Sequence, residues 1–183
     1  MKDINSIKKE LLKERGTENF HLALKELDPE DSRKVVESLN PNEIFIKVNH
    51  RTAEEDYICE YIDYLWDLSK KAFWRHVYIA LDEDIGILWG DDMLYFEKMC
   101  SNLIPKKILY KHIDLVASKK LDSSNPYKQD LEAVGCVLRA QKKNFNRWKT
   151  IKKYVKANYT NHEDLLKEIK TLTKTKCSYH FGD

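Results

Sequence analysis

Glycine and proline are scarce in this sequence, since five Gly and four Pro occur among 183 residues. Folds built from many short strands need these residues at their turns, whereas abundant Lys, Glu and Leu favour helices. No apolar run is long enough to cross a bilayer, and no N-terminal segment resembles a signal peptide. We therefore expect a mainly helical, cytoplasmic protein that has no membrane segment and keeps its cysteines reduced.

Sequence motifs for catalysis and metal binding are also missing. The four cysteines form no CxxC pair, and the six histidines form no HExxH motif. The sequence has no phosphate-binding glycine loop, no dinucleotide fingerprint and no GxSxG elbow. We predict a non-enzymatic protein that needs no cofactor and binds no metal.

Helical periodicity covers most of the chain. Asp28 and Pro29 have the residue types of an N-cap and of a first helical position. Gly135 lies inside an apolar helical pattern, which favours close packing of two helices there. Asn144 marks a weak point in the longest pattern, because asparagine is a mediocre helix former. The predicted helices cover about residues 3–14, 18–27, 29–39, 52–71, 91–102, 105–120, 127–157 and 161–174.

Two segments depart from the helical pattern. Residues 43–48 alternate in the manner of a strand and are rich in β-branched side chains. Residues 76–89 place apolar segments on both sides of an acidic cluster, which favours a hairpin, and a helix end followed by a buried loop is the alternative. The predicted fold is therefore mainly α, with a small antiparallel β-sheet around residues 43–89. A division into two small subdomains is one organisation that the pattern allows.

The net charge of +2 conceals two oppositely charged halves. Residues 1–100 carry 14 basic and 22 acidic residues, and residues 101–183 carry 18 basic and 8 acidic residues. Residues 122–126 have the composition of a linker. We predict an acidic N-terminal part over 1–121 and a basic helical C-terminal part over 127–183, with a single domain as the alternative. Opposed charges would also suit a homodimer.

The most informative segment runs from Arg139 to Lys156, where eight residues are basic and none is acidic. Alternating spacings of three and four place many of them on one face of a continuous helix. Phosphate groups attract such an array without sequence-specific contacts. We predict a regulatory protein that binds nucleic acid, such as DNA, or that binds a complex already bound to nucleic acid. Its phosphate contacts would come from Arg139, Lys142, Lys143, Arg147, Lys149, Lys153 and Lys156.

An apolar seam runs beside the basic residues on the same predicted helix. It consists of Leu138, Gln141, Phe145, Trp148 and Val155. Phe145 and Trp148 could stack on nucleic-acid bases. Their alignment with Leu138 favours packing in the protein core instead.

An acidic stripe on the predicted helix 52–71 supports a first alternative function. It consists of Asp56, Glu60, Asp63 and Asp67. A solvated helix face is the simplest interpretation, and pairing with the basic helix is another. Regularly spaced carboxylates also compete for cationic grooves. The alternative is therefore a small phage or mobile-element inhibitor, of anti-CRISPR or anti-restriction type, that binds a host nucleic-acid enzyme by protein contact or charge mimicry.

A second alternative function rests on Asp82, Asp84, Asp91 and Asp92. Carboxylates suit Mg²⁺, and two such ions cleave phosphodiesters in many enzymes. This cluster would therefore support a metal-dependent phosphodiesterase. Its spacing matches no known metal-binding loop, so a turn and helix caps explain these residues more simply.

Overall fold

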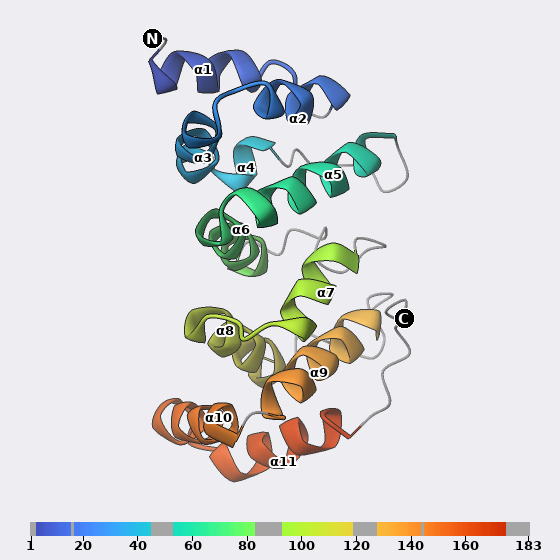
Figure 1. Ribbon diagram of the computed structural model, residues 1–183. Coiled ribbons are helices and arrows are strands. Elements are labelled where there is room, and N and C mark those ends of the chain that lie inside the picture. The colour runs from blue at the N-terminus through green and yellow to red at the C-terminus, as the bar shows by residue number, and fades with distance from the viewer. Residues whose placement is uncertain are drawn as a thin grey trace. The chain divides into compact units, whose positions relative to one another are not determined.

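The chain is mainly helical, as predicted, in the computed structural model (Figure 1). The structure describes residues 3–15, 17–44, 53–82, 93–118, 128–143 and 145–174. These residues contain no strand. None of the described helices combines the length and the apolar character that a membrane span requires. Packing contacts divide the chain into an N-terminal unit, Met1–Ile85, and a C-terminal unit, Gly86–Asp183.

The N-terminal unit packs short helices against two longer ones. Its helices are α1 (Ile4–Leu11), α2 (Glu18–Lys25), α3 (Pro29–Ser38), α4 (Pro41–Ile44), α5 (Ala53–Leu68) and α6 (Lys70–Asp82). The predicted cap of α3 is confirmed, because Asp28 Oδ1 accepts a hydrogen bond from the Glu30 backbone N–H at 2.9 Å. Such a cap satisfies one of the N–H groups that a helix start leaves without an intrahelical acceptor.

The segment predicted as a hairpin is instead helical as far as the structure describes it. α6 includes residues 76–82, so the strand prediction for these residues is wrong. Phe73, Val77 and Leu81 recur every four residues and are all buried, which is the pattern of a helix face and not of a strand. Glu43 and Ile44, the first two residues of the other predicted strand, belong to the short helix α4, so the strand prediction is wrong for them as well. Residues 45–52 and 83–92, which contain the remaining predicted strand residues, lie outside the described residues.

A serine divides the long helix predicted over residues 52–71. α5 ends at Leu68, and the buried Ser69 side chain accepts a hydrogen bond from the Ala72 backbone N–H at 3.3 Å. The same hydroxyl donates to a Glu37 carboxylate oxygen at 3.0 Å. Ser69 therefore caps α6 and fixes it against α3, and a helix break replaces the predicted continuity.

The C-terminal unit is built around α8 and α9. Its helices are α7 (Met93–Ser101), α8 (Lys106–Ala117), α9 (Lys128–Lys142), α10 (Phe145–Asn158) and α11 (His162–Leu172). α8 packs against α9 and α10, although the predicted linker at 122–126 separates them in sequence. The division by packing contacts lies between Ile85 and Gly86, and the predicted boundary at the linker stays a prediction.

Two residues of α9 explain how this unit packs closely. A Cβ atom added to Gly135 would lie 3.2 Å from the Leu172 carbonyl oxygen, so the predicted close helix packing is confirmed. The buried Gln141 side chain donates to the Met99 and Asn102 carbonyls, at 3.1 and 2.8 Å. Its oxygen accepts from the Ile104 backbone N–H at 3.3 Å. Gln141 therefore satisfies backbone groups where α7 ends.

Each unit buries a histidine within a helix. His76 Nδ1 donates to the Ala72 carbonyl oxygen, and His112 Nδ1 donates to the Ile108 carbonyl oxygen, both at 2.8 Å. Burial lowers the pKa of both imidazoles to about 4. Both are therefore neutral at pH 7, and the Tyr61 hydroxyl, whose own pKa is raised by burial, lies 3.3 Å from His76 Nε2.

Candidate nucleic-acid interface

The basic segment is divided between two helices. α9 ends at Lys142 and α10 begins at Phe145, so the prediction of one continuous basic helix is wrong. The break lies at the weak point predicted near Asn144, a residue outside the described ones. It allows Ile151 and Val155 of α10 to be fully buried where that helix packs against α8, α9 and α11. Burial of these two side chains fixes the direction in which α10 runs across its neighbouring helices.

Two of the seven predicted phosphate contacts have structural roles. Arg147 is half-buried, and its Nη2 donates to the Ile104 carbonyl oxygen at 2.7 Å. Lys142 is half-buried, and its Nζ donates to the buried Thr173 hydroxyl at 3.1 Å. These contacts connect α10 to the start of α8 and α9 to the end of α11. Their hydrogen bonds lie within the protein, which makes both residues poor candidates for phosphate binding.

Trp148 packs between two lysines. The Lys142 and Lys152 ammonium groups lie 5.2 and 5.5 Å from the centre of its ring, within cation–π range. The ring is half-buried, and the lysines compete with any base for its faces. Trp148 is therefore not a buried core residue, so its predicted core role is not confirmed, and base stacking stays a prediction. The Phe145 side chain lies outside the described residues.

Four exposed lysines form the outer side of α10, and we call them the lysine face. They are Lys149, Lys152, Lys153 and Lys156. A rotation of about 100° per residue places them within an arc of roughly 100°, opposite the buried Ile151 and Val155. Lys152 was not among the predicted contacts, although a rotation of about 100° per residue places it beside Lys149, Lys153 and Lys156 in any helix that contains all four.

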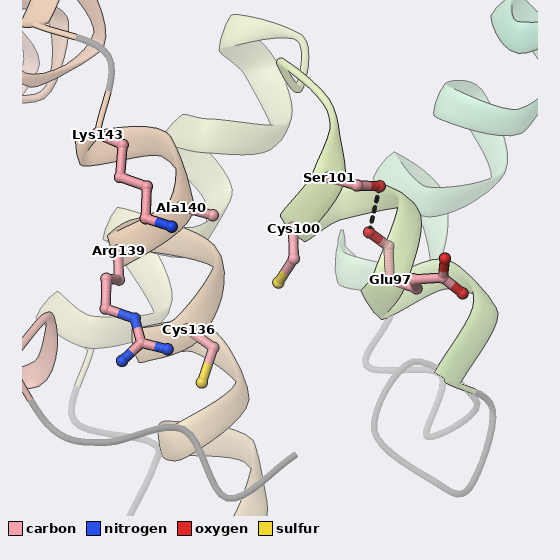
Figure 2. Close-up of a pocket in the computed structure, with 7 residues that line it drawn as sticks. All are labelled: Glu97, Cys100, Ser101, Cys136, Arg139, Ala140 and Lys143. Carbon is pink, nitrogen blue, oxygen red and sulfur yellow. Dashed lines mark hydrogen bonds between the residues drawn. The ribbon is translucent and has the colours of Figure 1, made fainter. Parts of the chain in front are cut away.

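The remaining predicted cations, Arg139 and Lys143, lie one helical turn apart beside a pocket between α7 and α9 (Figure 2). Cys100 points into this space from α7 (Figure 2). Burial raises the pKa of its thiol to about 12, although the positive charges of Arg139 and Lys143 act in the opposite direction. Cys136, in the opposite wall, is disulfide-bonded, which differs from the expected reduced state.

A tyrosine cluster lies on the side of α10 that meets α8. The rings of Tyr110 and Tyr154 are stacked, with centroids 3.9 Å apart and planes 5° from parallel. Tyr154 and Tyr159 both donate hydrogen bonds to Asp114 Oδ1. Burial and the Asp114 carboxylate raise the pKa of Tyr154 to about 12. These contacts hold α10 against α8, and sequence patterns gave no indication of them, because they join residues about 40 positions apart.

The acidic candidates are only partly described. Asp63 and Asp67 are exposed on α5, whereas the side chains of Asp56 and Glu60 lie outside the described residues. The side chains proposed for metal-dependent cleavage, Asp82, Asp84, Asp91 and Asp92, also lie outside them. In the part of the chain that the structure describes, no group of three or more His, Cys, Asp or Glu residues could hold a metal ion.

The ion pairs that the structure describes all belong to the N-terminal unit. They join Lys8 to Glu43, Lys34 to Glu30 and Asp31, and Lys71 to Glu37. No described ion pair involves the lysine face.

The chain was compared with protein families, curated proteins and solved structures. No family model matches it, and neither the curated proteins nor the solved structures give a match.

Proposed function

We propose that the C-terminal unit binds nucleic acid through phosphate contacts made by the lysine face of α10. The observation that carries this proposal is four exposed lysines on one side of a helix whose other side carries the fully buried Ile151 and Val155. Because the buried side fixes α10, the ammonium groups start from a rigid backbone. Little ordering of the main chain is then needed when a phosphate backbone binds.

Local electrostatics supports an anionic partner. The segment from Arg139 to Lys156 contains no acidic residue, and the next carboxylate along the chain is Glu163. The charges of the lysine face therefore add to one another instead of being cancelled within the helix. A surface of one sign attracts a polyanion over several ångströms and releases the counterions bound to that polyanion.

The length of the lysine face also fits a phosphate backbone. Lys149 and Lys156 are seven residues apart, which corresponds to about 10 Å along the helix axis. Phosphates follow one another at about 3.4 Å of axial rise along one strand of duplex DNA. About three to four phosphates could therefore meet the four ammonium groups. Such contacts recognise backbone charge and carry no direct base specificity.

Salt-titrated fluorescence anisotropy with labelled single- and double-stranded DNA and RNA tests the proposal. Four contacts predict a slope of log K against log salt of about −3 for a single strand and slightly below −3.5 for duplex DNA. Replacing Lys149, Lys153 and Lys156 together by Gln should reduce the magnitude of this slope by about two to three. A nearly unchanged slope would remove the lysine face from the interaction.

The same unit offers a matched control. Lys167, Lys170 and Lys174 lie on α11 or directly after it, and all three are exposed. Replacing them together by Gln changes the net charge equally but leaves the lysine face intact. We expect this control to retain most of the affinity. Equal losses in the two variants would indicate a response to net charge alone, and no binding at low salt would redirect the search to protein partners such as nucleic-acid enzymes.

A further inference from the structure

Two tyrosine rings lie face to face where α8 meets α10, and we call them the tyrosine stack. They are Tyr110 of α8 and Tyr154 of α10, whose ring centroids are 3.9 Å apart and whose planes are 5° from parallel. Both residues are half-buried, so neither belongs to the fully buried core. The tyrosine stack therefore lies at the edge of the core, with part of each side chain open to solvent.

Hydrogen bonds hold one ring of the tyrosine stack in place. The Tyr154 hydroxyl donates to Asp114 Oδ1 at 2.9 Å, and the Tyr159 hydroxyl donates to the same oxygen. The rings of Tyr154 and Tyr159 also meet edge to face, with centroids 6.3 Å apart. These contacts fix the orientation of the Tyr154 ring, so Tyr110 stacks on a rigid support.

Tyr110 has fewer partners than Tyr154. Among the described residues, Tyr154 is the only one whose ring contacts Tyr110, and no hydrogen bond involves the Tyr110 hydroxyl. An aromatic ring has two faces, and a stacked neighbour occupies one of them. The second face of Tyr110 is therefore not covered by any described ring, and a further planar group would extend the stack.

The tyrosine stack lies beside the lysine face on the same helix. Tyr154 follows the exposed Lys153, so a rotation of about 100° separates the two side chains. On a helix about 10–12 Å across, this rotation corresponds to an arc of about 10 Å. That is of the order of the distance from a phosphate to the far edge of its own base. The Asp114 carboxylate disfavours a phosphate at the tyrosine stack itself, which leaves the phosphates to the lysine face.

We propose that an unpaired base stacks on the outer face of Tyr110, so that the nucleic acid bound by the lysine face is single-stranded. This inference rests on the proposed function and names the class of nucleic acid that the same surface takes. A single strand can turn a base onto a protein ring, whereas both faces of a base inside a duplex are already stacked. Every base has such a face, so the contact carries little sequence preference.

Anisotropy titrations with three ligands of equal length test this inference. They are a single strand, the corresponding duplex and a strand that lacks its bases. We expect the wild type to bind the strand with bases about tenfold more tightly than the strand without them at the same salt concentration, because one stacked base is lost. This comparison needs no variant, so it does not depend on the stability of an altered protein.

Two substitutions at one position locate the stacking contact. Tyr110→Leu removes the ring but keeps an apolar side chain against Tyr154. We expect it to weaken binding of the single strand about tenfold and to leave binding of the duplex and of the strand without bases unchanged. Tyr110→Phe is the matched control, since it keeps the ring and removes only a hydroxyl that makes no described hydrogen bond. It should bind all three ligands as the wild type does.

Salt dependence separates this inference from the proposed function. Stacking releases no counterions, so Tyr110→Leu should lower the affinity for the single strand without changing the slope of log K against log salt, whereas the lysine-face variant changes this slope. Equal binding of the strands with and without bases would overturn the stacking inference. Equal losses for single strand and duplex in Tyr110→Leu would also overturn it. In either case the slope of the lysine-face variant would still decide the proposed function.

Discussion

The N-terminal unit carries 13 basic and 19 acidic residues, whereas the C-terminal unit carries 19 basic and 11 acidic residues. Both are helical, and both bury a neutral histidine whose Nδ1 bonds a carbonyl four residues earlier. The described ion pairs belong to the first unit, while the lysines on the outer side of α10 take part in none. The two units thus share a helical build but differ in the sign of their net charge.

The largest expected effect comes from giving α10 the charge sign of the N-terminal unit. Replacing Lys149, Lys153 and Lys156 together by Glu should weaken nucleic-acid binding about thousandfold at low salt, or about 4 kcal/mol, because three contacts are lost and repulsion replaces them. Thermal unfolding should change little, since all three side chains are exposed. Anisotropy and circular dichroism measure the two effects separately.

The corresponding reversal on α11 is the control for that variant. Lys167, Lys170 and Lys174 changed together to Glu alter the net charge by the same amount in the same unit. If this control lost as much affinity as the α10 variant, the difference between the two units would reflect overall charge and not a defined interface.

Acid should affect the two units alike, which tests the similarity of their cores. Burial lowers the pKa of His76 and of His112 to about 4 in the folded state, against a usual value near 6.5 when unfolded. Each histidine therefore leaves the free energy of unfolding unchanged above pH 6.5. It lowers this free energy as the pH falls from 6.5 to 4, because the unfolded state then binds a proton that the folded state does not. This corresponds to about 3 kcal/mol for each histidine by pH 4.

Urea unfolding at pH 7 and at pH 4.5, followed by tryptophan fluorescence in one experiment and by circular dichroism in another, measures this loss. A free energy of unfolding that stays constant over this range would mean that the imidazoles can charge without leaving the core. Loss confined to one of two resolved transitions would show that the units differ in their cores as well as their surfaces.

Overpacking at Gly135 should destabilise the C-terminal unit selectively. Gly135→Leu would push a side chain towards the Leu172 carbonyl, which already lies 3.2 Å from the position of a Cβ atom. We expect a loss of about 1–3 kcal/mol, typical of extra atoms in a packed core. Thermal unfolding measures it. Ala157→Leu at an exposed position of α10 is the control, and equal stability of both variants would contradict close packing of α9 and α11.

The features predicted from the sequence are those that depend on neighbouring residues. The Asp28 cap, the close approach at Gly135 and the burial of Leu138 and Val155 follow from local residue types and from helical spacing. The β-branched residues of the 76–82 segment misled the strand prediction, because the same side chains also suit a buried helix face. Tertiary packing decided between the two.

The candidate interface was harder to predict, because a charge pattern does not show which basic side chains have partners inside the protein. Arg147 donates to the Ile104 carbonyl, 43 residues away. Such a contact has no local signature, so no sequence pattern sets Arg147 apart from the exposed lysines. The phosphate contacts of this segment stay a prediction.

Ser69 offers the smallest and most local test of how the N-terminal unit is held together. Ser69→Ala removes the acceptor for the Ala72 N–H and the donor to Glu37, and it should cost about 1 kcal/mol, as for other N-caps. Hydrogen bonds from Lys71 and from Ser69 lower the pKa of Glu37, so this pKa should rise in the variant, measurable by NMR titration. Ser118→Ala is the control in the other unit, because the Ser118 hydroxyl is exposed and donates only to the Leu115 carbonyl in the last turn of α8. If the two substitutions had equal effects on unfolding, Ser69 would be an ordinary surface serine in energetic terms, and the break between α5 and α6 would have to arise from packing alone.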